Sequence, residues 1–395
     1  MHPSFIKPRY DSGGFARNTP THSRSICFQK YDAVVLFFVD AFGWRFFERF
    51  QEAPFIKRIA KHGKVEKITS QFPSTTAAHV TTMHTGLNVG QSGVHEWYYY
   101  EPLVDRVIAP LLFSYAADGK GRDSLGNKIK PDALYPKGVF YPALSAMGVE
   151  SLNYGIRDYT PSSYSKVVMR GSEIISFKTL SEALINLGLR LEKQTKPTFV
   201  HLYFDKIDAI AHEYGPASPQ TEAEIETFLL MMENYFDRVF GSGKRILFLM
   251  TADHGMCEVD PQTTTYLNTD REFAGVERFI RSNKRGHLIV PAGSARDMFM
   301  YIKPDMLDEA QDFFLKRLEG KADVVKTETL IEAGYFGASV SERFTERAGN
   351  LILLPYRYES VWWYEKDRFE MKFLGHHGGL TPQEMETVLY SLEVG

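Results

Sequence analysis

The chain has 395 residues, of which 44% are hydrophobic and 14% aromatic, and its formal net charge is −3. This composition is that of a globular protein with enough apolar side chains for a large core. The near-neutral charge argues against nucleic-acid binding through a broad basic face, so we expect no stable complex with nucleic acid. No stretch approaches the roughly 20 apolar residues of a membrane span, and we expect no membrane association.

Two cysteines, Cys27 and Cys257, are too few for a disulfide framework. Because the N-terminus also lacks the apolar core of a secretory signal, we predict a reducing, cytoplasmic location. The first residues are rich in Pro, Ser, Thr and Arg and contain a single acid, Asp11, which predicts a flexible arm over residues 1–29. We interpret residues 30–395 as one domain, and the sequence carries no indication of an oligomeric state.

Short runs of β-branched and aromatic residues alternate along the chain with longer amphipathic stretches. This alternation is typical of a parallel sheet with helices on both faces. The strands that we predict are 33–39, 198–204 and 245–250, with the more polar 64–68 as a further candidate. The helices that we predict include 177–191 and 220–239.

The alternation of strand-like and helical segments changes after the predicted strand 245–250. A polar loop over 260–284 is followed by short β-branched runs and by a helical stretch around 306–318. No internal repeat or low-complexity segment marks a second domain, so we predict a small β/α cap inserted at about 260–345. The predicted fold class is therefore α/β, a three-layer sandwich with a mostly parallel central sheet and an inserted cap.

Three aspartates stand where predicted strands end. Asp40 directly follows the first strand, Asp208 lies shortly after the second, and Asp253 closes the third. In open α/β sheets, ligands bind beyond the carboxyl ends of the parallel strands, which meet at one edge. We therefore expect the three carboxylates to converge.

Histidines accompany these aspartates. His212 follows Asp208 by four residues, which places both on one face of a helix. His254 directly follows an aspartate, and His377 stands in a glycine-rich turn near the end of the chain. Carboxylate and imidazole ligands suit Zn²⁺ or a similar borderline metal. Clustered carboxylates would repel one another without metal, so we expect the metal-free protein to be less stable.

The segment 72–86 is rich in small and hydroxyl residues and suits a turn from a strand into a helix. Thr76 lies at or near the predicted helix N-terminus, where free backbone N–H groups favour an anion. A hydroxyl held there beside a divalent cation can ionise and attack phosphorus. An ordinary helix cap produces the same local pattern, so this segment alone does not distinguish a nucleophile from a cap.

Taken together, these segments resemble the alkaline phosphatase superfamily, and within it most closely the type I phosphodiesterase and nucleotide pyrophosphatase branch. The motifs that carry the resemblance are Asp40, Pro73-Ser74-Thr75-Thr76 with Thr85-Gly86, Asp208 and His212 before Gly215-Pro216, Asp253-His254-Gly255 and His377-Gly378-Gly379. They span residues 33–385 in the family's order, and dispersed motifs in order are more specific than any one alone. The resemblance implies an alkaline-phosphatase-like fold.

The resemblance also implies two divalent metal ions, with Zn²⁺ preferred and Mn²⁺ as the alternative. The ligands of one ion would be Asp40, Thr76, Asp253 and His254. The ligands of the other would be Asp208, His212 and His377.

The family's spacing also implies Thr76 as the nucleophile, three residues after the proline and nine before the next Thr-Gly pair. The family's pattern favours His377 over His376 and Asp208 over Asp205 as metal ligands.

The family commonly places an asparagine three residues after its nucleophile, where it holds a phosphoryl oxygen. This chain has His79 at that position. Because an imidazole N–H can donate the same hydrogen bond, we assign the phosphoryl-oxygen contact to His79.

The activity that the resemblance implies is hydrolysis of phosphodiester or phosphoanhydride bonds through a phospho-threonine intermediate, with a small phosphodiester or a nucleotide as substrate. A phosphomonoesterase, which would want an additional cation such as Arg, and a phosphonate hydrolase are the alternatives within the superfamily. A non-catalytic, metal-stabilised binding module is the alternative from another class. Competent residue types at every ligand and nucleophile position argue against that module.

Overall fold

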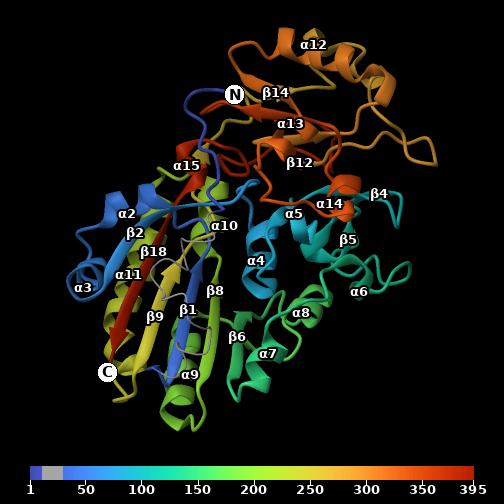
Figure 1. Ribbon diagram of the computed structural model, residues 1–395. Helices are drawn as coiled ribbons and strands as arrows, with labels where there is room; N and C mark the ends of the chain where they lie inside the picture. The colour runs from blue at the N-terminus through green and yellow to red at the C-terminus, as the bar shows by residue number, and fades with distance from the viewer. Residues whose placement is uncertain (11–29) are drawn as a thin grey trace.

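The computed structural model describes residues 1–10 and 30–395, and its centre is a seven-stranded sheet (Figure 1). The strand order is β2-β18-β9-β1-β8-β6-β7. β1 (Ala33–Val39) lies in the middle and pairs in parallel with β8 (Thr198–Phe204) and β9 (Ile246–Thr251). The predicted central strands are therefore confirmed, and their carboxyl ends lie at the same edge.

Four further strands complete this sheet. β6 (Glu150–Ile156) and β7 (Glu173–Phe177) continue the parallel part beyond β8. β18 (Glu386–Val394) runs antiparallel both to β9 and to β2 (Lys64–Thr69). β2 forms the edge of the sheet and its side chains are partly or fully exposed, which explains why its sequence is more polar than that of the central strands.

Helices cover both faces of the sheet, which gives the three layers that the sequence predicts (Figure 1). The helices whose apolar residues join the core on one face are α2 (Trp44–Phe50), α3 (Pro54–His62), α9 (Leu180–Lys193) and α11 (Pro219–Phe240). The helices toward the other face are α4 (Thr76–Thr85), α7 (Tyr141–Ala146) and α8 (Ser163–Val168). No helix in the described part of the chain is both long and apolar enough to cross a membrane.

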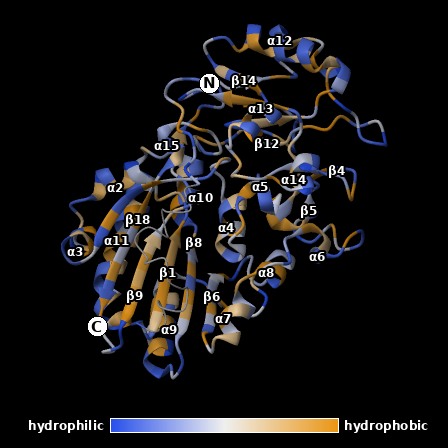
Figure 2. Ribbon diagram, viewed as in Figure 1, coloured by the Kyte–Doolittle hydropathy of each residue, from blue (hydrophilic) through white to orange (hydrophobic). Residues whose placement is uncertain are grey.

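The side chains of β1 alternate between the two layers. Val35, Phe37 and Val39 belong to the core cluster that includes α9 and α11, whereas Phe38 belongs to the cluster that includes α4 and α8. Burial on both faces explains why β1 is apolar throughout. Figure 2 shows the same hydrophobic character along β1 and β9.

In the region of the predicted cap, four strands form an antiparallel sheet with helices packed beside it. Its strands, in spatial order, are β12 (Gly293–Ser294), β13 (Asp297–Met300), β15 (Leu351–Pro355) and β14 (Ala322–Lys326). The helix α12 (Leu307–Arg317) contacts β14. The cap extends to residue 355, beyond the expected limit of 345, because β15 lies between β13 and β14 and is needed to join them.

Shorter elements connect these layers. A three-stranded sheet is formed by β3 (Tyr99–Glu101), β4 (Arg106–Ala109) and β5 (Ser114–Tyr115). Two-stranded ladders are formed by β10 (Cys257–Glu258) with β17 (Gly375–His376) and by β11 (Thr265–Tyr266) with β16 (Val361–Trp362). The remaining α-helices are α5 (Val89–Ser92), α6 (Pro131–Leu134), α10 (Lys206–Tyr214), α13 (Thr327–Glu332), α14 (Glu342–Arg347) and α15 (Pro382–Met385).

The first residues of the chain are held against the rest of the protein. The backbone N–H of Ile6 donates to the carbonyl of Leu380 at 2.8 Å, and the Tyr10 hydroxyl donates to a backbone carbonyl at 2.7 Å. Phe5 and Ile6 also pack against a buried apolar cluster. The flexible arm predicted over residues 1–29 is therefore wrong for residues 1–10, and the rest of that arm lies outside the described residues.

Candidate metal centre

Asp40 and Asp253 meet because they follow neighbouring parallel strands. The backbone N–H of Asp40 continues the sheet by donating to the carbonyl of Phe204 at 2.8 Å. Asp253 Oδ1 accepts the N–H of Ala41 at 3.1 Å and that of His254 at 3.0 Å. Ala41 has a φ of 61°, so the chain turns sharply directly after Asp40. The Asp253 carboxylate thereby fixes the turn that follows Asp40.

His254 and Thr76 complete this first group. His254 Nε2 lies 3.4 Å from Asp40 Oδ1 and 3.4 Å from Asp253 Oδ2. Thr76 Oγ1 lies 3.2 Å from His254 Nε2 and 3.3 Å from Asp40 Oδ2. The structure therefore brings together the four residues that the sequence assigns to one ion.

Asp208, His212 and His377 form the second group. Asp208 and His212 lie one turn apart on α10, which begins directly after β8, and His212 Nε2 is 3.5 Å from Asp208 Oδ2. His377 directly follows β17, and its Nε2 is 3.7 Å from Asp208 Oδ1. The His377 ring stacks on the His254 ring with centroids 3.6 Å apart, so the two groups adjoin each other. His254 also lies within 4.8 Å of the ligand atoms of Asp208 and His377.

The three histidines present Nε2 to the carboxylates because each Nδ1 is bonded to a backbone carbonyl. These pairs are His212 with Gly375 at 2.8 Å, His254 with Gly255 at 2.8 Å and His377 with Ser74 at 2.9 Å. A carbonyl oxygen only accepts, so each Nδ1 carries the proton and each Nε2 keeps its lone pair. Burial lowers the pKa of His212 to about 3 and that of His377 well below its usual range, so both rings are neutral. Neutral imidazoles oriented in this way fit metal ligands.

Two of the three carboxylates each have one oxygen without a donor. Among the described residues, Asp208 Oδ1 and Asp253 Oδ2 are buried and have no hydrogen-bond partner. Burial raises the pKa of Asp40 well above its usual range, and the charges of Asp253 and Asp208 raise it further. Burial and the charges of Asp253 and Asp205 raise the pKa of Asp208 in the same way. Ionised carboxylates in such a cluster need compensating cations, so the site fits divalent metal ions.

The residues that compete with Asp208 and His377 in the sequence have other partners. Asp205 Oδ2 accepts the Tyr159 hydroxyl at 2.8 Å. The His376 ring lies beside His212 with centroids 5.3 Å apart. Of the two adjacent histidines, His377 is the one whose ligand atom converges with those of the other candidates.

His79 does not present a free N–H to the site. Its Nε2 accepts the backbone N–H of Gln71 at 3.1 Å, so Nδ1 carries the proton and donates to the carbonyl of Thr75 at 2.8 Å. Burial lowers the pKa of His79 to about 4, so the ring is neutral and both nitrogens are engaged. This arrangement gives no support to the predicted contact between His79 and a phosphoryl oxygen.

Tyr203 is a site residue that the sequence did not reveal. It lies in β8 opposite Phe38 of β1, and its hydroxyl donates to Asp40 Oδ2. This bond orients the Asp40 carboxylate. The one available signal is a tyrosine hydroxyl near the end of a mostly apolar strand, and tyrosine is common in strands for packing alone.

Ser74 joins the Thr76 segment to the turn that carries His377. Its hydroxyl donates to the carbonyl of Gly379 at 2.8 Å, and it accepts the N–H of Gly378 at 3.2 Å. The Ser74 N–H donates to the carbonyl of Gly378, also at 3.2 Å. These bonds keep both segments at a fixed distance.

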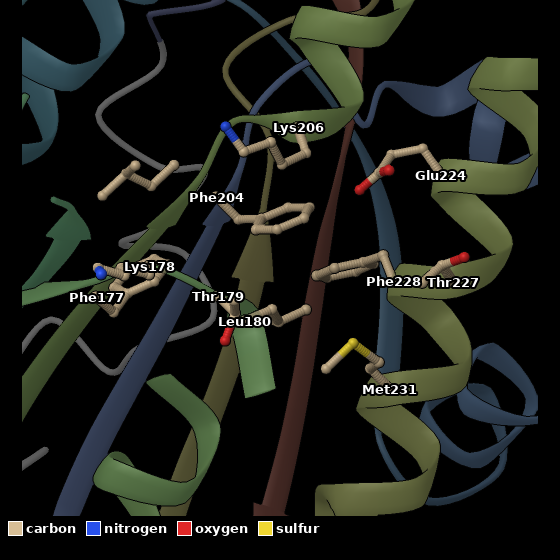
Figure 3. A pocket seen from close by; sticks show the side chains of 11 residues that line it. Phe177, Lys178, Thr179, Leu180, Phe204, Lys206, Glu224, Thr227, Phe228 and Met231 are labelled. Atoms are coloured by element: carbon tan, nitrogen blue, oxygen red, sulfur yellow. The ribbon is translucent and has the colours of Figure 1, made fainter. Parts of the chain in front are cut away.

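A cavity of about 240 Å³ lies elsewhere, between β8, α9 and α11 (Figure 3). Its lining is mostly apolar and includes Phe204, Phe228 and Met231, with Lys206 and Glu224 at one side. No metal-ligand candidate lines this cavity, so it is separate from the metal centre.

The comparison with protein families agrees with this geometry. The family model of type I phosphodiesterase / nucleotide pyrophosphatase matches residues 34–380. The chain therefore belongs to this family, a branch of the alkaline phosphatase superfamily, and is a hydrolase that acts on phosphoric ester bonds. Enzymes of this family depend on dinuclear metal sites. No curated protein matches the chain in a sequence search.

Solved structures share the fold at low sequence identity. Murine ectonucleotide pyrophosphatase / phosphodiesterase 5 has a TM-score of 0.67 at 16% identity, with 91% of this chain and 87% of that chain covered. An inactive variant of the murine protein in complex with AMP has a TM-score of 0.67 at 15% identity, and the human protein has 0.66 at 16%, both with the same coverage. The predicted fold class is confirmed.

The charge of Asp208 gives a first test. We expect Asp208→Asn to raise the melting temperature of metal-stripped protein, because it removes one of the mutually repelling buried carboxylates. The same change should lower the melting temperature of metal-loaded protein and reduce the bound metal from two ions to one. Calorimetry and elemental analysis measure both effects. Asp205→Asn, three residues earlier, is the matched control and should keep both metal ions. An Asp208→Asn protein that also keeps both metal ions would contradict the ligand assignment.

Gly378 gives a second test. Its φ is +125°, and a Cβ there would lie 2.5 Å from Asp297 Oδ1 and 2.5 Å from Ser294 Oγ. At Gly86, with φ +72°, a Cβ would meet no described residue within 4 Å. We expect Gly86→Ala to lower the free energy of unfolding by about 1 kcal/mol, and Gly378→Ala to lower it by about 3 kcal/mol and to weaken metal binding through His377. Equal losses in urea denaturation would show that the turn is not tightly packed.

Proposed function

We propose that the protein hydrolyses phosphodiester or phosphoanhydride bonds in two steps, through a phospho-threonine at Thr76. The observation that carries this proposal is the position of the Thr76 hydroxyl, which lies 3.2 Å from His254 Nε2 and 3.3 Å from Asp40 Oδ2. Two divalent ions bound by the two ligand groups would supply positive charge that favours ionised Thr76 and offsets charge on the reacting oxygens.

The local structure presents Thr76 to an incoming phosphoryl group. Thr75 is extended and caps α4, so Thr76 is the first residue of a ten-residue helix. The first backbone N–H groups of a helix have no intrahelical partner, and with the helix dipole they favour an anion. The next two residues, Ala77 and Ala78, are small. The helix N-terminus therefore supports binding of the phosphoryl oxygens.

The bonds exchanged in the two steps follow from this position. In the first step, a bond forms between Thr76 Oγ1 and phosphorus while the bond to the leaving oxygen breaks. In the second step, a bond forms between phosphorus and a water oxygen while the bond between phosphorus and Thr76 Oγ1 breaks, and a proton from the water restores the Thr76 hydroxyl. The chain's own part is to hold the nucleophile in line and to bind the non-bridging oxygens.

The charges around the site favour a phosphodiester over a phosphomonoester. In the part of the chain that the structure describes, the ion pairs of Asp40, Asp208 and Asp253 are all with His212, His254 or His377. No lysine or arginine in the described part of the chain forms an ion pair with the three aspartates. A doubly charged phosphomonoester would need an additional cation. A singly charged diester suits the site better.

A nucleotide is the substrate class that we propose. The murine structure in complex with AMP supports it, since that protein has the same fold. We propose Zn²⁺ as the metal because imidazole and carboxylate ligands suit it, with Mn²⁺ as the alternative. The cytoplasmic location stays a prediction from the sequence.

The test compares a chromogenic phosphodiester with its phosphomonoester, using metal-reconstituted protein. We expect faster hydrolysis of the diester, and a loss of at least about 10³-fold in kcat for Thr76→Ala with the metal content largely retained. A phosphopeptide at Thr76 in rapidly quenched reactions, detected by mass spectrometry, would identify the intermediate directly.

Thr85→Ala is the matched control, because Thr85 lies at the other end of α4 and its hydroxyl bonds to the Thr81 carbonyl at 2.7 Å. This variant should keep its activity. Full turnover by Thr76→Ala would remove the nucleophile from the proposal. Monoester preference would keep the family and overturn the diester reading, and metal binding without any hydrolysis would favour a binding module.

A further inference from the structure

A second pair of acids is buried beside the nucleophile segment, outside the candidate metal centre. Glu96 lies shortly before β3, and Asp297 is the first residue of β13, so the two come from distant parts of the sequence. Both side chains are 0% exposed. The segments that carry them are joined by a hydrogen bond from the Gly293 N–H to the Tyr98 carbonyl at 2.6 Å.

Donors reach one oxygen of each carboxyl and leave the other oxygen without a partner. Glu96 Oε2 accepts the backbone N–H of Trp97, and Asp297 Oδ1 accepts the hydroxyl of Ser294 at 2.5 Å. Glu96 Oε1 and Asp297 Oδ2 are buried and receive no donor from the described residues. The two carboxyl groups are nevertheless within hydrogen-bonding reach of each other. Two carboxyl groups form a hydrogen bond only when one of them is protonated.

The surrounding charges do not neutralise this pair. Arg296 and Glu384, on the Asp297 side, form their own fully buried ion pair with a distance of 2.9 Å. On the Glu96 side the nearby groups are the Trp97 N–H and the Thr75 hydroxyl, which are uncharged. Burial raises the pKa of Glu96 to about 8 and that of Asp297 well above its usual range, and the two acids' proximity adds to the latter shift. Near neutral pH the pair therefore keeps at least one proton.

The pair contacts both segments that the proposed reaction requires. The hydroxyl of Thr75, the residue directly before the nucleophile, lies beside Glu96 and lowers the pKa of its carboxyl. Ser294 Oγ lies 2.5 Å from Asp297 Oδ1 and 3.0 Å from the carbonyl oxygen of His377. The single hydroxyl proton of Ser294 thus links the acid pair to the turn of the second ligand group.

We propose that Glu96 and Asp297 share one proton and act as a positioning pair for the nucleophile segment and for the turn that carries His377. Glu96 acts through Thr75, and Asp297 acts through Ser294. The inference rests on the proposed function, which it extends to a part of the molecule that touches neither the substrate nor the metal ligands directly. Loss of the shared proton leaves two facing carboxylates, which repel each other and separate the two segments.

The test uses Glu96→Gln, whose amide donates a hydrogen bond to Asp297 but has no proton to lose. We expect this variant to keep wild-type kcat and KM at pH 7. Above pH 8 the wild-type kcat should fall relative to the variant, by up to about tenfold per pH unit, because the fraction of protonated pairs falls in that proportion. Glu96→Ala, which removes the hydrogen bond, should lose kcat at every pH with little change in KM.

Thermal stability provides a readout that needs no activity. The pKa of Glu96 is higher in the folded protein, at about 8, than its ordinary value of 4.5. The folded state therefore binds more protons than the unfolded state between these values, and wild-type stability declines as pH rises through this window. The melting temperature of Glu96→Gln minus that of wild type should grow from pH 5 to 8 and level off above pH 8. Glu332→Gln, an exposed change in the cap, should show no such trend.

Each outcome decides between the two proposals. In one outcome, the wild type hydrolyses phosphodiesters while its kcat ratio to Glu96→Gln and its difference in melting temperature from Glu96→Gln do not change with pH. That result overturns the shared proton alone. A wild type without hydrolysis overturns the proposed function and, with it, the positioning role. A third bound ion that Glu96→Gln loses would show that a cation, and not a proton, lies between the acids.

Discussion

Three aspartates lie within reach of one another at the carboxyl edge of the central sheet, and this concentration of negative charge is the constraint on which the site depends. It follows from strand order, since β1 lies between β8 and β9 and all three are parallel. Burial and mutual repulsion raise the pKa values of Asp40 and Asp208, and the neutral His212 and His377 beside them supply lone pairs and no positive charge. The arrangement that is unfavourable without cations is therefore the one that binds divalent ions strongly.

The backbone of distant segments fixes the orientation of the ligands. Carbonyls of Gly375, Gly255 and Ser74 each hold one histidine with Nε2 toward the aspartates. Ser74 belongs to the nucleophile segment, so the bond that orients His377 also fixes the distance between that turn and the N-terminus of α4. The cap reaches the same turn through Ser294. Core, nucleophile segment and cap therefore assemble the site together, and a change in one is transmitted to the others.

Most of the fold and the clustering of the candidate ligands could be predicted from the sequence because both depend on local patterns. An apolar run that ends in an aspartate specifies a buried strand and the position of its acid, as for Asp40, and the four-residue spacing to His212 specifies a helical face. The remainder depends on contacts between distant segments. Nothing near His79 shows that its ring bonds to Gln71, and no periodicity relates Glu96 to Asp297. The first ten residues have the composition of an arm, yet Phe5 and Ile6 pack on an apolar surface that the later chain builds.

The most direct measurement of the central claim is a crystal structure of the metal-loaded protein with anomalous scattering at the metal edge. Two ions about 3.5 to 4 Å apart are expected, one bound by Asp40, Thr76, Asp253 and His254 and the other by Asp208, His212 and His377. His254 lies close to both ligand groups in the present structure. The ion that His254 binds in the metal-loaded protein is therefore the most informative contact. A single ion bound by His254 between Asp208 and Asp253 would contradict the dinuclear site and the reaction built on it.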